Sequence, residues 1–123
     1  MLKQIRWDEL TKEQLSPKLL RQYFTAGDVT IARFQMKQGL RIATHHHVSE
    51  QIMNIQQGVV KVWTDGGEYL LREGDVLCIP PNMPHSSEVL ADAVVLDVFS
   101  PPRTDWVAGE DAYLRGISTQ AAE

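Results

Sequence analysis

Short apolar segments rich in β-branched and aromatic residues recur along the chain from residue 19 onward. They cover residues 19–24, 28–36, 40–47, 51–57, 59–64, 68–71, 76–80 and 87–99. Turn-forming residues separate them, and Asp65-Gly66-Gly67 has the composition of a tight hairpin turn. Because many short strands need an arrangement that hides their edges, the pattern predicts an all-β sandwich or jelly-roll barrel.

The two ends of the chain differ from this pattern. Residues 1–18 are polar, with Trp7 and Leu10 as the strong apolar anchors, so we expect an N-terminal arm with one helical turn. The barrel is expected to occupy residues 19–106. Residues 107–123 are polar again, and we expect them to wrap around the outside of the barrel.

Composition narrows the class of protein. A length of 123 residues suits one domain, and 12 Lys and Arg against 16 Asp and Glu give a formal charge of −4 without a basic run, so no nucleic-acid partner is expected. No apolar stretch approaches the roughly 18 residues of a membrane span, and the first residues lack the apolar core of a signal peptide. The single Cys78 suits a reducing compartment. We therefore expect a cytoplasmic protein without a membrane contact.

Three consecutive histidines end one of the predicted strands. Since alternate side chains of a strand share a face, His45 and His47 are expected to project together while His46 points away. Gln51 follows four residues after His47. His85 comes after a stiff proline-rich segment that could place it across the barrel from the other two.

The spacing of these residues resembles the two motifs of the cupin superfamily. The first motif is matched by Gly39, His45, His47, Gln51 and Gly58, and the second by Gly74, Pro80 and His85. The linker between them, residues 59–73, is short, as in small microbial cupins. The resemblance implies a single cupin jelly-roll barrel (a double-stranded β-helix). It also implies one divalent transition-metal ion (Ni, Zn, Fe, Mn or Co) held by His45, His47, Gln51 and His85.

The sequence departs from the cupin motifs at two positions. Asn82 stands where the second motif usually has Gly, and Asn tolerates the same left-handed backbone. Gln51 stands where most cupins carry a Glu ligand. A neutral ligand set leaves the metal charge uncompensated, which favours anion binding and Lewis-acid chemistry over redox chemistry. A one-residue bulge would instead bring Glu50 into the site and restore a charged ligand.

A carboxylate interrupts the last apolar strand, Val94–Phe99. Burying an unpaired charge is costly, so Asp97 needs a partner or a function. Strand alternation places Asp97 on the same face as Phe99, and the stiff Pro101-Pro102 pair then presents Arg103.

The segment from Asp97 to Arg103 resembles the closing motif of the KdgF pectin-degradation cupins, and Glu50-Gln51 is similar to a pair in the same proteins. The likeness covers roughly residues 19–106. It implies opening of 4,5-unsaturated monouronates, released from pectin or alginate, to the linear 4-deoxy-5-keto form. Asp97 and Arg103 would then be the catalytic residues, with Asp97 transferring the proton, and Phe99 and Arg103 would line the substrate pocket.

The same residues also allow other interpretations. Asp97 is alternatively the structural ion-pair partner of Arg103 or Arg33. Arg41 shares strand parity with His45, so it is a candidate substrate contact, with a surface position as the alternative. The protein as a whole is alternatively a non-catalytic or sensor cupin that binds a small anionic sugar, or a cupin dioxygenase.

The predicted sheet also has an unpartnered outer face. An apolar outer face next to a detachable arm commonly packs against a second copy of the chain. We therefore expect a homodimer to which residues 1–18 contribute.

Overall fold

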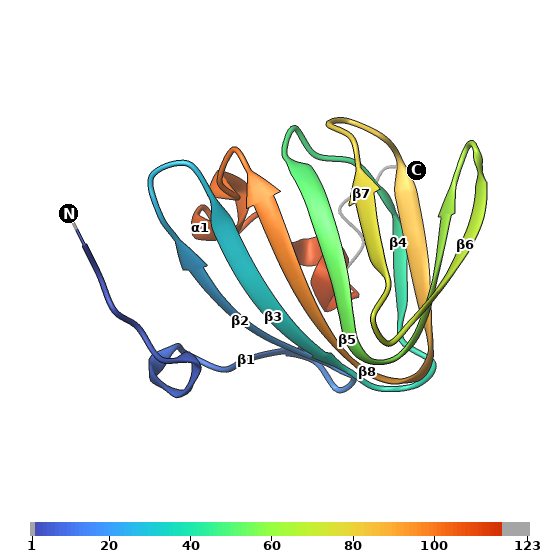
Figure 1. The fold of residues 1–123 in the computed structure, drawn as a ribbon, viewed down its shortest axis with the longest axis horizontal. Coiled ribbons are helices and arrows are strands. Elements are labelled where there is room, and N and C mark those ends of the chain that lie inside the picture. The colour runs from blue at the N-terminus through green and yellow to red at the C-terminus, as the bar shows by residue number, and fades with distance from the viewer. Residues whose placement is uncertain (1, 117–123) are drawn as a thin grey trace.

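The computed structural model describes residues 2–116, which form mainly antiparallel strands (Figure 1). In chain order the elements are η1 (Trp7–Glu9), β1 (Glu13–Ser16), β2 (Leu19–Thr25), β3 (Thr30–Met36), β4 (Arg41–His45), β5 (Glu50–Thr64), β6 (Gly67–Arg72), β7 (Val76–Ile79), β8 (His85–Ser100), α1 (Thr104–Val107) and η2 (Ala112–Arg115). The all-β jelly roll expected from the sequence is confirmed. None of the helices among these residues is long and apolar enough to cross a membrane.

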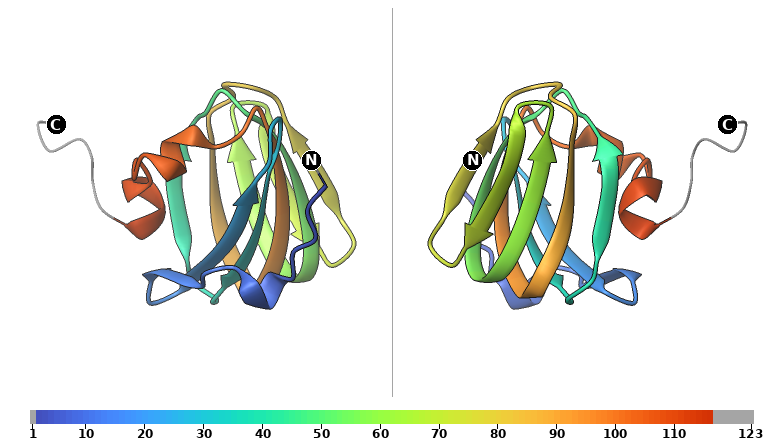
Figure 2. Two further views of the ribbon diagram at one scale, coloured as in Figure 1. Left: turned by 90° about the vertical axis from the view of Figure 1, so that its left-hand side faces the viewer. Right: turned by 90° about the vertical axis from the view of Figure 1, so that its right-hand side faces the viewer.

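The long strands β5 and β8 belong to both walls of the barrel. Near residue 53, β5 lies between β7 and β8, and the sheet continues through β3 and β2 to β1. Near residue 62, β5 and β8 again pair with each other, with β6 on the other side of β5 and β4 on the other side of β8. The two walls therefore curve around one interior, as the side views in Figure 2 show.

Gly58 is the point at which β5 bends from one wall to the other. Its φ is +85°, and a Cβ atom there would lie 2.2 Å from the carbonyl oxygen of Asp92 on β8. The neighbouring strand is too close for any side chain. Segments 51–57 and 59–64, expected as separate strands, are consequently one bent strand. Asn82 has a φ of 63°, the left-handed conformation that the sequence predicts there.

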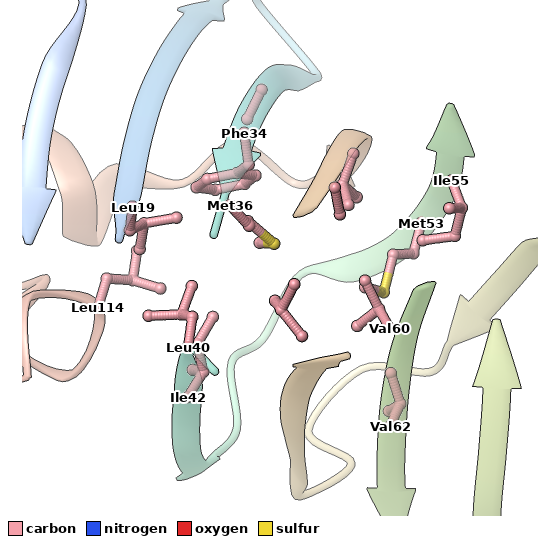
Figure 3. Packing of buried hydrophobic residues seen from close by; sticks show 14 of the residues in the cluster. Leu19, Phe34, Met36, Leu40, Ile42, Met53, Ile55, Val60, Val62 and Leu114 are labelled. Atoms are coloured by element: carbon pink, nitrogen blue, oxygen red, sulfur yellow. The ribbon is translucent and has the colours of Figure 1, made fainter. Parts of the chain in front are cut away.

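Inward-facing side chains of both walls form the core (Figure 3). Phe34, Val95 and Ile55 lie opposite one another on β3, β8 and β5, and all three are buried. Full burial of each such side chain contributes roughly 1.5–3 kcal/mol. This apolar core lies beneath the polar residues of the site.

Both ends of the chain are more integrated than the sequence suggested. The sheet begins at Glu13 rather than at residue 19, because β1 pairs with β2, whereas η1 is the expected helical turn of the arm. The C-terminal segment is not merely a polar wrap. Trp106 and Leu114 are 4% and 6% exposed and pack against the barrel, so α1 and η2 cover it. The remaining part of that prediction, residues 117–123, lies outside the described residues.

Candidate metal centre

Three histidines from three places in the chain meet at one end of the barrel. His45 ends β4, His85 begins β8 directly opposite it, and His47 lies in the loop that follows β4. One ring nitrogen from each lies within 4.8 Å of the others. The His45 and His85 rings are 4.3 Å apart and the His47 and His85 rings 5.1 Å apart, between centroids. This separation suits ligands that share one ion.

Backbone carbonyls fix the same tautomer in all three rings. Each Nδ1 lies 2.8 Å from a carbonyl oxygen, which accepts a hydrogen bond and cannot donate one. The pairs are His45 with Ala43, His47 with Ser49, and His85 with Met83. Each Nδ1 therefore carries the proton, and each Nε2 offers a free lone pair.

Gln51 adds an oxygen to these nitrogens. Its Oε1 lies 3.1 Å from His47 Nε2, and its amide nitrogen donates to Asp97 Oδ2, also at 3.1 Å. Because Nε2 and Oε1 both present lone pairs, they repel each other unless a cation lies between them. Three imidazole nitrogens and an amide oxygen suit a divalent transition metal.

The neighbours of these ligands face away from the site. His46 is exposed, as expected. Glu50 is exposed too, and its carboxylate lies 3.7 Å from the sulfur of the exposed Cys78 on β7. The alternative in which Glu50 replaces Gln51 is wrong, because the inward position on β5 is occupied by Gln51, which is 7% exposed.

Burial keeps the histidines neutral. The pKa of His45 is lowered to about 3 and that of His47 to about 4, mainly by burial and to a smaller extent by nearby cationic groups. The pKa of His85 is lowered for the same main reason. Since metal ligation requires neutral imidazoles, the cluster stays competent to bind a metal well below neutral pH.

Asp97 lies beside this cluster in a cavity that is also lined by His45, His85, Phe99 and Arg103. Burial raises the pKa of Asp97 to about 7, although Gln51 and Arg103 act in the opposite direction. Its Oδ1 has no hydrogen-bond partner within residues 2–116. The carboxyl group is thus able to hold a proton near neutral pH and has one oxygen free for a ligand.

Neither proposed ion pair of Asp97 is found among the described residues. Arg103 directs its guanidinium to Asp105 instead, at 2.7 and 3.0 Å. Arg33 lies on the opposite face of β3 from Ala32, which is the residue aligned with Asp97. The purely structural pairing is therefore wrong.

Aromatic rings hold Arg103 in place. Its guanidinium lies 4.7 Å from the Phe99 ring and 4.4 Å from the Trp106 ring. Burial alone would lower the pKa of Arg103, but the ion pair with Asp105 and the hydrogen bond to Tyr113 outweigh it and raise the pKa. A fixed cation thus faces the cavity near the metal ligands.

Comparison with known proteins shows the family and the fold of the chain. Residues 29–99 match the family model of the AraC-like ligand binding domain. The chain belongs to this family and has the cupin fold. KdgF from Halomonas sp. has a similar structure: the TM-score is 0.74 at 27% identity, over 80% of this chain and 94% of that one. An RmlC-like cupin from Shewanella frigidimarina NCIMB 400 has a TM-score of 0.75 at 24% identity, over 80% and 90%, which shows the fold.

The cupin also matches a curated relative. It is 33% identical over 78 residues to quercetin 2,3-dioxygenase of Bacillus subtilis (strain 168), over 63% of the chain. The chain spans only 23% of the length of that relative.

Arg41 of the cupin does not reach the cavity, so its expected place beside His45 is wrong. Its side chain is 78% exposed and lies 3.5 Å from Glu88. The pairing of β4 with β8 shifts register between Ile42 and His45, and this shift breaks the strand alternation on which the prediction depended.

Sequence reasoning missed two residues that line the cavity, Trp106 and Tyr113. Trp106 is the last residue of the expected barrel and Tyr113 lies in the polar segment after it, and no motif marks either residue. Their aromatic side chains were the one signal in the sequence, because tryptophan and tyrosine are usually buried to a large extent.

Proposed function

We propose that this cupin is a metal-dependent enzyme that opens 4,5-unsaturated monouronates, from pectin or alginate breakdown, to the linear 4-deoxy-5-keto form. The observation that carries the proposal is Asp97: a carboxyl group with a free oxygen, one hydrogen bond away from a metal ligand and in one cavity with Arg103. Binding alone needs no proton-transfer group in an apolar strand. The structural similarity to KdgF adds support.

The ligand set favours an anionic substrate. His45, His47, Gln51 and His85 would hold the metal, and none of the four carries a negative charge. When bound, a divalent metal supplies Lewis-acid polarisation of substrate oxygens. Arg103 also lines the cavity. Its Nε and Nη2 already donate to Asp105 and Tyr113, so a substrate carboxylate would be met by Nη1.

The proposed reaction is an isomerisation and balances without an oxidant or reductant. The proton of the C1 hydroxyl leaves to solvent as C1=O forms, and the C1–O bond of the ring breaks. The electrons of that bond form the C5 carbonyl, and the C4=C5 double bond takes up a proton at C4. The substrate and the product have the same atoms and the same oxidation level.

The roles of the residues follow from their positions. Asp97 delivers the proton to C4, because the residue lines the cavity, its Oδ1 has no hydrogen-bond partner within residues 2–116, and no basic side chain among them forms an ion pair with it. Arg103 holds the substrate carboxylate. Phe99, 2% exposed and packed against both the His47 ring and Arg103, forms the apolar side of the pocket.

A second candidate function is ligand binding without turnover, as in a sensor for a small anionic sugar. The description of the matched family, a ligand binding domain, favours it. The dioxygenase alternative rests on the curated relative. It is disfavoured by Gln51, since a carboxylate ligand is typical of cupin sites that support redox chemistry.

Ultraviolet spectroscopy tests the proposal. Metal-loaded protein is mixed with an unsaturated monouronate, and the absorbance of the conjugated alkene is followed beside a sample stripped of metal by a chelator. We expect the absorbance to fall far faster with the loaded protein. Binding of the uronate without loss of absorbance would support the sensor. If the protein neither binds the uronate nor lowers its absorbance, both candidate functions are refuted.

We also propose that the protein forms a homodimer through the outer face of the larger wall. Apolar side chains lie opposite one another there across five neighbouring strands: Phe24, Ile31, Val98, Ile52 and Cys78. The ammonium group of Lys3 lies 5.8 Å from the Phe24 ring, so the arm borders this row.

A cytoplasmic location, inferred from the single cysteine, stays a prediction.

A further inference from the structure

Tyr113 of η2 lies directly against the candidate metal centre. Its ring packs on the His45 ring at 4.4 Å between centroids and 32° between planes. Its hydroxyl is 2.6 Å from Nη2 of Arg103. The residue therefore touches a metal ligand on one side and the cavity cation on the other.

The hydrogen bonds of this hydroxyl leave its proton free. The oxygen accepts from Arg103 Nη2 and, at 3.3 Å, from Nε1 of Trp106. A phenol oxygen has two acceptor positions and one proton, so both acceptor positions are taken. In the described part of the chain the proton meets no acceptor of its own, although Tyr113 belongs to the cavity wall.

We propose that Tyr113 is a ligand-contacting residue whose O–H donates to a carboxylate oxygen of the anion bound at the histidine cluster. Two donors, one of them cationic, polarise the hydroxyl and strengthen it as a donor to an anion. The identity of the ligand as a uronate rests on the proposed function. The hydrogen bond itself requires only a small carboxylate at the site.

A buried ion pair holds the tyrosine in position. Asp111, immediately before η2, accepts from Nη2 of Arg21 at 2.8 Å, and both side chains are almost fully buried. The Arg21 guanidinium also lies 4.5 Å from the Trp106 ring. The hydroxyl is thus fixed before the ligand arrives, which reduces the entropy lost on binding.

Tyr113→Phe tests the proposal, because it removes the hydroxyl and keeps the ring on His45. Tyr69→Phe is the matched control: Tyr69 is 40% exposed and its hydroxyl lies 3.9 Å from the Cβ position of Gly66, in the β5–β6 turn. Both variants and the unmodified protein are loaded with cobalt(II). Galacturonate and glycolate are titrated in, and the visible spectrum of the metal reports binding.

We expect Tyr113→Phe to lower the affinity for both carboxylates by about tenfold to a hundredfold, the loss typical of one hydrogen bond to a charged group. Metal content should match that of the unmodified protein, whereas the melting temperature should fall somewhat, because Arg103 and Trp106 each lose an acceptor. Tyr69→Phe should bind as the unmodified protein does. A metal content that falls with Tyr113→Phe would instead indicate a role in supporting His45 and would overturn the proposal.

The outcomes separate this inference from the proposed function. Equal dissociation constants for Tyr113→Phe and the unmodified protein overturn the inference, even if unsaturated uronates are turned over. Carboxylate binding that depends on Tyr113, without turnover of an unsaturated uronate, supports the inference and refutes the proposed reaction. If neither carboxylate binds the unmodified protein, the inference is overturned as well.

Discussion

The amide of Gln51 and the carboxyl group of Asp97 are joined by a 3.1 Å hydrogen bond from Nε2 to Oδ2. This bond orients the amide, because the nitrogen is held by Asp97 and the oxygen is turned toward His47. Asp97 therefore acts on the candidate metal site without being one of its ligands. A carboxyl group thus lies one hydrogen bond beyond the candidate ligand Gln51, at the position that the proposed proton transfer requires.

Gln51→Glu is expected to bind metal more tightly and to turn over substrate more slowly. A carboxylate near a divalent ion gains several kcal/mol of attraction even at a dielectric constant of about 20, so metal affinity should rise about tenfold or more. Asp97 would lose its N–H donor and face a like charge, and anionic ligands would lose part of their attraction. Competition with a chelator measures the metal affinity, and galacturonate titration measures the ligand affinity.

Gln56→Glu provides the control for this substitution. It adds the same charge to β5 at an exposed position. It should leave metal affinity and turnover unchanged. If Gln51→Glu left both unchanged as well, Gln51 would have no place among the metal ligands.

Asp97→Asn is expected to lower kcat by roughly 10²-fold or more with little change in KM. Asparagine keeps the shape and still accepts the hydrogen bond from Gln51, but it has no acidic proton to deliver. The metal and Arg103 remain to bind the substrate. Asp92→Asn, at an exposed position of the same strand, is the control. Turnover at the original rate by Asp97→Asn would show that the carboxyl group is structural.

Much of the fold was predictable because it depends on local patterns. The Asp65-Gly66-Gly67 turn joins β5 to β6 as the turn residues indicate. The full length of β5 was missed because Gly58 normally signals a break, and only its close approach to Asp92 shows that it bends a continuous strand. Strand β1 was missed because Leu15 is its one apolar residue.

The site was predictable only where spacing along the chain decides position. The motif spacing brings the three histidines together, and strand alternation places Asp97 with Phe99. Alternation failed for Arg41, because a register shift is not visible in the sequence. Tyr113 was missed because its place depends on contacts between distant segments, above all the pair between Arg21 and Asp111.

The stability of the metal-free protein should depend on pH through Asp97. The pKa of Asp97 is about 7 in the folded protein and near 3.8 in the unfolded chain, so between these values the folded state binds more protons. Stability is therefore lost as pH rises from about 4 to 7, by about 4 kcal/mol at most. Asp97→Asn should melt at the same temperature as the original protein near pH 4 and higher at pH 8. The measurement is thermal unfolding in the presence of a chelator.

The histidines have the opposite effect on stability: they destabilise the folded protein as the pH falls. With their pKa values lowered to about 3 and 4 by burial, His45 and His47 stay neutral when folded but take up protons below about pH 6.5 when unfolded. Their contribution to stability is lost as pH falls through that range. Because it is common to both proteins, it cancels in the comparison with Asp97→Asn. A difference that did not grow with pH would contradict the raised pKa of Asp97.

Asp111→Asn should destabilise the C-terminal cover of the barrel. It removes a negative charge that neutralises the buried guanidinium of Arg21. Arg21 would then have Glu13, at 3.1 Å, as its remaining acidic partner. We expect a loss of about 2 kcal/mol or more in the free energy of unfolding, measured in urea, and weaker binding of galacturonate because Tyr113 is less well fixed. Asp8→Asn, which alters an exposed ion pair with Arg6, should change neither quantity measurably. Unchanged stability of Asp111→Asn would mean that Glu13 alone satisfies Arg21.

The proposed dimer predicts that a charge in the middle of the outer row separates the subunits. Ile52 lies between Val98 and Cys78 in that row and is 37% exposed in the single chain. Lysine at this position would have to bury an unpaired charge in the interface, so Ile52→Lys should raise the dimer dissociation constant by about 100-fold or more. Leu90→Lys is the control, because Leu90 is 39% exposed on the part of β8 that belongs to the other wall. Light scattering at micromolar concentration should give twice the chain mass for the original protein and for Leu90→Lys, and the chain mass for Ile52→Lys. A monomeric original protein, or a dimer that Ile52→Lys leaves intact, would rule out this face as the interface.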